Sequence, residues 1–290
     1  MDISKLKQFK IKYKLNLIFA LSGVLLIVAL ITVYMIYTAT HYSIDFYHVS
    51  NSHIKGNVRI VFVSDLHNHQ YGKGNERLVE DIRALKPDLI ISGGDMVVES
   101  DDDYEIALNL CSELSQIAPL YGILGNHEEA RIYQRNDKEL RSKFEKAGLN
   151  ILANETATVK INRNVIELIG ISGGEKQFDI YGAKDFMDNL PKKKADVRIC
   201  ISHVPITFKT KLNSYDFDLG LSGHTHGGLI RIPKLGALYS SEEGFFPDYY
   251  AGMYQNDNGP FIISRGLGDS RPIPRIHNPH ELSVIDLKWY

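Results

Sequence analysis

The sequence predicts an α/β fold with a largely parallel sheet and a second sheet packed on it, preceded by one membrane-spanning helix. Three observations lead to this prediction. A lysine-rich N-terminus is followed by an uncharged apolar stretch, β-branched runs then alternate with helical spacing, and strand-like runs dominate the second half. The chain has 290 residues, of which 44% are hydrophobic and 23% charged, as is ordinary for a globular protein.

The N-terminal segment predicts a membrane anchor. Five lysines fall within residues 1–14, and residues 15–38 carry no charge. A helix of that length rises about 36 Å, enough for a hydrocarbon core of about 30 Å, and Tyr34 and Tyr37 lie at its far end, where aromatic rings favour the interface. A cleaved signal peptide would have a shorter apolar core, and a buried helix would show a polar face. We therefore expect an uncleaved single-pass signal anchor in the cell membrane, with residues 1–14 cytoplasmic and the remainder extracytoplasmic.

The next part of the chain predicts a βαβαβ unit. Residues 39–56 are expected to be a connector, with a possible edge strand at 44–48. The predicted elements after it are a strand at 58–63, a helix at 75–85, a strand at 89–92, a helix at 104–114 and a strand at 120–124. Such alternation is typical of a largely parallel sheet whose strands are buried on both faces.

The second half predicts another sheet. The expected elements are a hairpin of 156–161 and 165–171 that turns at 162–164, then strands at 197–202, 217–221 and 282–287. Because no linker separates the two halves, we expect one catalytic domain over residues 57–290.

Charge and cysteine content narrow the possible functions. The formal net charge of -2 argues against a stable nucleic-acid partner, which usually requires a basic excess. The only cysteines are Cys111 and Cys200, each among apolar neighbours. Two buried thiols are the favoured interpretation, while a single Cys111–Cys200 disulfide stays open.

Polar side chains follow five of the predicted strands. They are Asp65 and His67, Asp95, Asn126 and His127, His203, and His224 and His226. The carboxyl ends of strands in open α/β sheets line one edge, and on an extended chain residues two apart point to the same side. Each of these residues alone is weak evidence of a site. Five strand ends that all carry polar side chains without a ligand would, however, cost free energy of folding. The donor set suits Mn, Fe or Zn.

This ordered series, spanning residues 57–230, resembles the calcineurin-like metallophosphoesterases. The tail at 264–268 with Arg275 and Ile276 resembles the bacterial membrane-associated branch typified by the YaeI and YkuE phosphodiesterases. The resemblance implies a four-layer α/β/β/α sandwich of two mixed sheets flanked by helices, with two divalent metal ions at its rim, Mn being favoured.

The resemblance also implies roles for individual residues. Asp65, His67 and His226 would bind the first metal, Asn126, His203 and His224 the second, and Asp95 would bridge both. A hydroxide held between the metals would attack phosphorus, while His127 would contact the phosphate and help to protonate the leaving oxygen. Protein Ser/Thr phosphatases of this superfamily carry an Asp where this chain has Val98, so that activity is disfavoured and the group that orients His127 stays open.

Further residues are candidates for substrate binding. Arg265, Arg271 and Arg275 are candidate phosphate ligands, the alternative being solvated surface arginines. His69 is either substrate-facing or a surface residue, and an aromatic cluster at 245–254 is either core or in part a lipid-contacting surface.

These features lead to one expected function and several alternatives. We expect a membrane-anchored enzyme that hydrolyses phosphodiester or pyrophosphate bonds, with a phospholipid or lipid-linked substrate as one candidate. The alternatives are an extracytoplasmic nucleotidase or general phosphomonoesterase, and an inert membrane-tethered binding scaffold. A metal-dependent nuclease is disfavoured by the charge balance.

Overall fold

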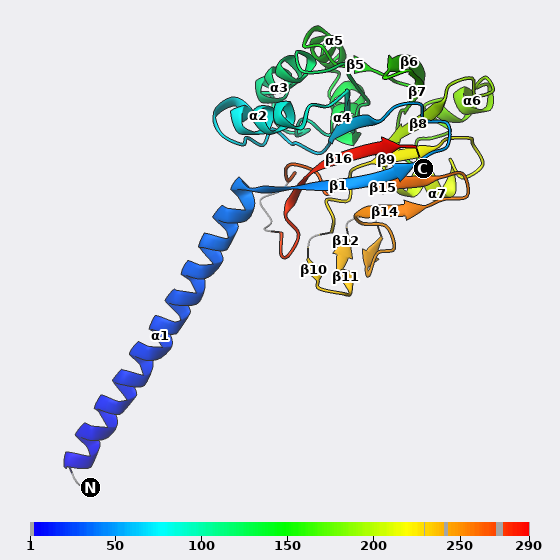
Figure 1. The fold of residues 1–290 in the computed structure, drawn as a ribbon. Helices are drawn as coiled ribbons and strands as arrows, with labels where there is room; N and C mark the ends of the chain where they lie inside the picture. Colours follow the sequence, from blue (N-terminus) through cyan, green and yellow to red (C-terminus); the bar gives the residue numbers. More distant parts are fainter. Residues whose placement is uncertain (1–2, 229, 241–242, 271–274, 290) are drawn as a thin grey trace. The chain divides into compact units, whose positions relative to one another are not determined.

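The computed structural model describes residues 3–228, 230–240, 243–270 and 275–289, which form two compact units, 1–40 and 41–290 (Figure 1). The first unit contains the helix α1 (Ile3–Thr40), in which Lys10–Thr40 is long and apolar enough to span a membrane. The helix extends beyond the apolar residues 15–38 at both ends, since the flanking lysines and threonines also accept helical backbone.

The first sheet of the second unit is mixed. Its strand order is β1-β16-β2-β3-β4-β5, formed by Tyr42–Ser50, His280–Lys288, Val58–Val63, Leu89–Ser92, Leu120–Gly122 and Asn150–Ile151. Strands β2 to β5 run parallel, β16 is antiparallel to β2, and β1 is parallel to β16. The strand expected within the connector is therefore β1, a nine-residue edge strand of this sheet.

The second sheet is also mixed. Its order is β14-β15-β9-β8-β7-β6, formed by Gly252–Gln255, Pro260–Ile263, Leu219–Ser222, Val197–Ser202, Asn164–Ile171 and Glu155–Ile161. The hairpin β6–β7 closes through Asn162 and Arg163, which have φ values of 46° and 70°. Two successive residues with positive φ make the type of turn that matches the twist of the paired strands.

The two sheets pack face to face, and helices cover both outer faces. Along β2, Ile60 and Phe62 point into the core between the sheets, whereas Val61 and Val63 point into the core under the helices α2 (Glu76–Leu85), α3 (Glu105–Ser115) and α5 (Leu140–Lys146). The helices α6 (Ala183–Asp188) and α7 (Ile206–Thr210) contribute to the core on the far side of the second sheet. This confirms the expected four-layer sandwich.

The strand register places the start of the domain at the edge that carries the site. Asp45, Ser283 and Phe62 lie in one row across β1, β16 and β2. From this row, three residues towards the N-terminus of β1 lead to Tyr42, and three towards the C-terminus of β2 lead to Asp65. Because β1 and β2 are antiparallel, both steps go to the same edge. The two residues are separated by two strand spacings, about 10 Å.

Several elements were not expected from the sequence. The helix α4 (Asn126–Gln134) begins at Asn126, one of the predicted metal ligands. Two small hairpins follow His224 and His226: β10–β11 (Arg231–Ile232 and Gly236–Ala237) and β12–β13 (Tyr239–Ser240 and Gly244–Phe245). The short helix η1 (Lys73–Asn75) precedes α2. Cys111 and Cys200 lie in different cores as free buried thiols, so the disulfide alternative is excluded.

Candidate metal centre

The motif residues sit in tight turns at the ends of the strands. Asp65, His67, Asp95, His224 and His226 all have positive φ, between 49° and 72°. The expectation of extended Asp-x-His and His-x-His pairs is therefore wrong. Left-handed backbone at a non-glycine residue is uncommon and stores strain, which persists where the surrounding structure imposes it.

The turns are held by hydrogen bonds from the backbone to the motif carboxylates themselves. The amide of His224 donates to Asp65 Oδ1 at 2.9 Å, and the amide of His127 donates to Asp95 Oδ1 at 2.8 Å. Each carboxylate thus ties its own turn to a second motif. Both are completely or almost completely buried.

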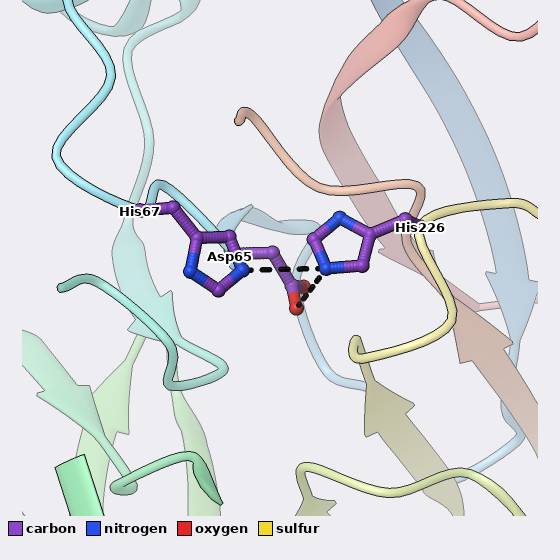
Figure 2. Close-up of side chains that lie close together, drawn as sticks. All are labelled: Asp65, His67 and His226. Atoms are coloured by element: carbon purple, nitrogen blue, oxygen red, sulfur yellow. Dashed lines mark hydrogen bonds and ion pairs between the residues drawn. The ribbon is translucent and has the colours of Figure 1, made fainter. Parts of the chain in front are cut away.

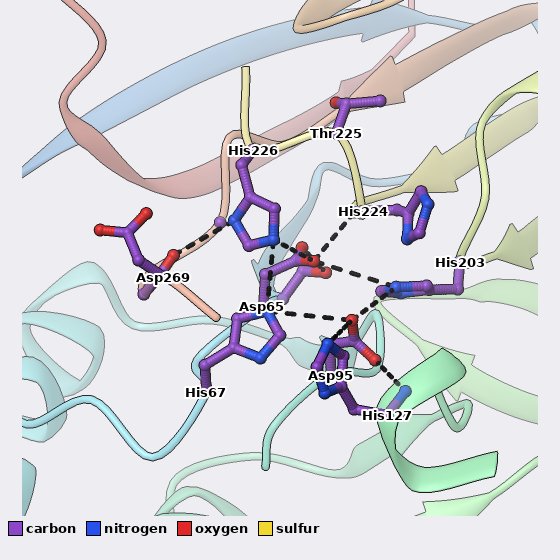
Figure 3. A network of polar contacts seen from close by, with 12 residues as sticks. Asp65, His67, Asp95, His127, His203, His224, Thr225, His226 and Asp269 are labelled. Atoms are coloured by element: carbon purple, nitrogen blue, oxygen red, sulfur yellow. Dashed lines mark hydrogen bonds and ion pairs between the residues drawn. The ribbon is translucent and has the colours of Figure 1, made fainter. Parts of the chain in front are cut away.

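The side chains converge in three overlapping groups (Figures 2 and 3). The groups are Asp65, His67 and His226; His67, Asp95 and His127; and Asp95, His203 and His224. Within each group the candidate ligand atoms lie within 4.8 Å of one another, so each group could hold a metal ion. Asp95 belongs to two of the groups, and it shares one of them with His67, which is also a member of the first group.

The Nε2 atoms of three histidines point into the interior of the site. His67 Nε2 and His226 Nε2 face each other at 3.3 Å, and His203 Nε2 lies 3.1 Å from Asp95 Oδ2 (Figure 3). The other ring nitrogen of His203 contacts the Gly93 carbonyl at 2.7 Å, and that of His67 contacts the Val97 carbonyl at 3.3 Å. A carbonyl partner on Nδ1 leaves Nε2 for a metal.

His203 provides the test of whether these residues fit a metal. Its buried Nε2 faces two carboxylates, Asp95 Oδ2 at 3.1 Å and Asp65 Oδ1 at 3.9 Å, yet it makes no well-aligned hydrogen bond with a described residue. A buried nitrogen that faces carboxylate oxygens is unfavourable unless a proton or a cation lies between them. A divalent cation at this point satisfies His203 and the neighbouring carboxylates together, so the donor set fits the metal that its chemistry suggests.

The charges of the buried groups depend on one another. Burial opposes ionisation of Asp65 and Asp95, but the neighbouring imidazoles lower the pKa of both carboxyls below the usual range. Burial lowers the pKa of His67, and it lowers the pKa of His226 to about 3. Ionised carboxylates and neutral imidazoles are the forms that bind metals. For His203, burial is outweighed by Asp95 and Asp65, which raise its pKa to about 10.

Glu128 organises two of the loops and was given no role at the sequence level. Its carboxylate is buried and accepts the backbone amides of Asp95 at 2.8 Å, Val97 at 3.0 Å and Gly125 at 2.8 Å. The bond to Gly125 is one half of a capping box at the start of α4. A glutamate three residues after Gly125, the residue that caps the unexpected helix α4, was the signal in the sequence.

His127 is oriented by a backbone amide. The Glu99 amide donates to His127 Nδ1 at 2.9 Å, so the neutral ring carries its proton on Nε2. That nitrogen lies 3.9 Å from Asp95 Oδ2, at the centre of the site. The backbone amide of Glu99 therefore orients His127 in this chain, where Val98 stands in place of the aspartate of protein Ser/Thr phosphatases.

A pocket of about 270 Å³ adjoins the second group of ligands. It is bordered by Asn126, His203 and His224 and continues over polar residues of α4 and of the segment 173–181. Lys176 is exposed there, and no ion pair between described residues involves it. Glu129 also borders this pocket. Burial raises its pKa to about 7, and it accepts the Gly173 amide at 2.6 Å.

The tail arginines are placed differently from the expectation. Arg265 is buried and pairs with Asp45 at 2.7 Å and with Glu281 at 2.8 Å. Arg275 is buried, pairs with Asp269 at 2.6 Å, and lies 2.9 Å from His226 Nδ1. Both guanidinium groups thus have partners inside the protein, and neither is a solvated surface arginine. A phosphate contact by Arg265 or Arg275 stays a prediction.

Two other candidates can be placed only in part. Arg271 lies outside the described residues. His69 is half-buried, and its ring packs edge-on against Tyr71 with the ring centres 4.7 Å apart.

Comparison with known proteins agrees with this geometry. The sequence profile of the calcineurin-like phosphoesterases matches residues 58–228. Phosphodiesterase YaeI of Escherichia coli K12 is 26% identical over 235 residues, which cover 79% of this chain and 82% of the relative. The uncharacterized metallophosphoesterase YkuE of Bacillus subtilis is 27% identical over 243 residues, covering 79% of each chain.

Solved structures include the phosphopantetheinyl hydrolase PptH of Mycobacterium tuberculosis, which aligns with a TM-score of 0.48 at 11% identity, over 74% of this chain and 92% of that chain. The profile spans more than half of the chain and includes every motif residue described above. The chain therefore belongs to the calcineurin-like phosphoesterase family.

Proposed function

We propose that the chain is a membrane-anchored phosphodiesterase with two metal ions. Asp65, His67 and His226 would hold one ion, Asn126, His203 and His224 the other, and Asp95 both. The observation that carries the proposal is the convergence of the aspartate and histidine ligand atoms in three overlapping groups, each within 4.8 Å, two of which contain Asp95. A pair of divalent ions supplies Lewis acidity and a hydroxide nucleophile at neutral pH.

His127 acts on the substrate as a hydrogen-bond donor. Since the Glu99 amide occupies Nδ1, the donor is Nε2–H, which faces the interior of the site beside Asp95. A donor there stabilises the negative charge that develops on the phosphate and on the leaving oxygen. The exposed ammonium of Lys176 and the polar pocket beside Asn126 would bind the group attached to the phosphate.

The proposed membrane anchoring and lipid substrate are supported by α1 and by the strand register of the first sheet. The lysines before the apolar stretch favour an N-terminus in the cytoplasm and a catalytic unit outside the cell membrane. The helix ends at Thr40 and β1 begins at Tyr42, so a single residue links them. Tyr42 lies at the same sheet edge as Asp65. With α1 in a membrane, a one-residue link would limit how far the edge at Tyr42 could lie from the bilayer, which favours a phospholipid or lipid-linked substrate.

The experiment is a comparison of substrates with the full chain in detergent, loaded with Mn. We expect cleavage of bis-p-nitrophenyl phosphate to exceed cleavage of p-nitrophenyl phosphate, and a phospholipid or lipid diphosphate to be cleaved as well. A preference for the monoester or for soluble nucleotides would replace the proposal by a phosphomonoesterase or nucleotidase. Bound metal without hydrolysis of any ester would leave a binding scaffold.

A further inference from the structure

The two small hairpins that follow the last histidine motif expose large apolar side chains. Leu235, Phe245 and Phe246, here called the apolar hairpin surface, are 73%, 72% and 66% exposed. Leu235 lies at the turn between β10 and β11, and Phe245 ends β13. Phe246 also has a φ of 54°, a conformation that is rare for a bulky residue. A strained backbone that presents an aromatic ring to solvent calls for a partner.

The hairpins are connected to each other and to the metal site. The amide of Phe246 donates to the Leu238 carbonyl at 2.9 Å, and the Tyr239 and Phe245 rings pack with centres 5.3 Å apart. At their base, Asn278 Nδ2 donates to the carbonyl of His226 at 2.7 Å. The first hairpin thus begins five residues after the candidate metal ligand His226.

The base of the hairpins lies at the edge where the chain enters the domain. The Arg231 amide donates to the Ile276 carbonyl at 3.0 Å, and the chain then reaches His280, which pairs with Tyr42. Residue 42 follows the end of α1 by two positions. The site, the chain entry and the base of the hairpins therefore share one edge of the domain.

Two cations flank the apolar side chains. No ion pair between described residues involves Arg231 or Lys234, and Arg231 lies over the ring of Tyr250 at 5.5 Å. The carboxylate of Glu243 is turned onto the amides of Asp248 and Tyr249, both at 3.1 Å. Apolar and aromatic tips beside cations that pair with no described carboxylate match a bilayer surface with anionic headgroups.

We propose that Leu235, Phe245 and Phe246 contact the lipid bilayer beside the metal site. The inference rests on the membrane anchorage proposed above. The contact would hold the active edge against the membrane, so that a lipid headgroup reaches the metals without leaving the bilayer.

The test uses tryptophan quenching by lipids with brominated acyl chains, with the full chain in phosphatidylcholine and phosphatidylglycerol vesicles. Trp289 is the only tryptophan and follows the end of β16, about 30 Å along β1 and β16 from the edge at Tyr42. In wild type it serves as the internal control and stays unquenched. In the background Trp289→Phe, both Phe245→Trp and Phe246→Trp are expected to be quenched.

A kinetic arm separates this inference from the proposed function. The double variant Phe245→Ser and Phe246→Ser should raise KM for a vesicle-presented diester by about tenfold. Its hydrolysis of soluble bis-p-nitrophenyl phosphate should stay unchanged. Unquenched tryptophans at both positions in variants that cleave the soluble diester normally would overturn the inference. Concentration-dependent cross-linking of two chains through these positions, without quenching, would also overturn it, because the surface would then bind protein.

Discussion

Replacing Glu128 by alanine removes the acceptor of three buried backbone amides, those of Asp95, Val97 and Gly125. A buried amide left without an acceptor costs about 1–3 kcal/mol. Loss of the carboxylate also relieves the cost of burying it, since burial and the Asp95 carboxylate raise the pKa of Glu128 to about 7. A control variant that also removes a buried carboxylate is therefore needed, so that the contribution of the three amide hydrogen bonds can be measured separately.

Glu129 is that control. It lies on the same helix, its pKa is also raised to about 7 by burial, and it accepts one amide, that of Gly173. Glu128→Ala and Glu129→Ala both remove the cost of burying a carboxylate, so this contribution cancels when their stabilities are compared. What remains is the loss of two more amide hydrogen bonds in Glu128→Ala. We expect Glu128→Ala to lower the free energy of unfolding by about 2–6 kcal/mol more than Glu129→Ala.

The assay is urea unfolding of the full chain in detergent, followed by far-ultraviolet circular dichroism, with metal content measured on the same samples. Glu128→Ala should also bind metal more weakly, because its loops carry Asp95 and Asn126. Equal stability of the two variants would refute the assignment of Glu128 as the group that holds these loops together.

Three further outcomes are expected. Lys176→Ala should raise KM for diesters while kcat changes little, and Lys192→Ala, which alters an exposed lysine outside the pocket, should leave both unchanged. The hydrogen bond from Arg59 lowers the pKa of Asp286. Its stabilisation is therefore present above the ordinary carboxyl pKa of about 4 and is lost as the pH falls through the lower folded-state value. In acid titrations of unfolding, the advantage of wild type over Asp286→Asn should accordingly shrink below about pH 4. The two cysteine thiols, whose pKa burial raises to about 12, should resist iodoacetamide in the folded protein and react in urea, as mass spectrometry would show.

The sequence allowed the strands and most of the site to be predicted, because both depend on local patterns. Apolar runs such as 58–63 and 197–202 are long enough to mark buried strands, and the polar residue at each strand end marks the edge at which ligands meet. This rule predicts Asp65, Asp95 and His203 at one edge, and in the structure His203 Nε2 lies within 4 Å of both carboxylates.

The remaining features depend on contacts between residues far apart in the chain. Arg265 follows a strand in a glycine-rich tail, as a phosphate ligand could, but it pairs with Asp45 on the edge strand. The group that orients His127 is a backbone amide, which no side-chain pattern reveals. The left-handed turns at His67 and His226 were missed because their residue types do not require positive φ.

The most direct test of the central claim measures metal content and diester cleavage together. The full chain, its Asp95→Asn variant and its His127→Ala variant are loaded with Mn, freed of excess metal, and assayed on bis-p-nitrophenyl phosphate. We predict two ions per chain and diesterase activity in wild type, and loss of both in Asp95→Asn. For His127→Ala we predict retained metal with kcat lowered by about 10²–10⁴-fold. Full activity in metal-free protein or in Asp95→Asn would contradict the two-metal account.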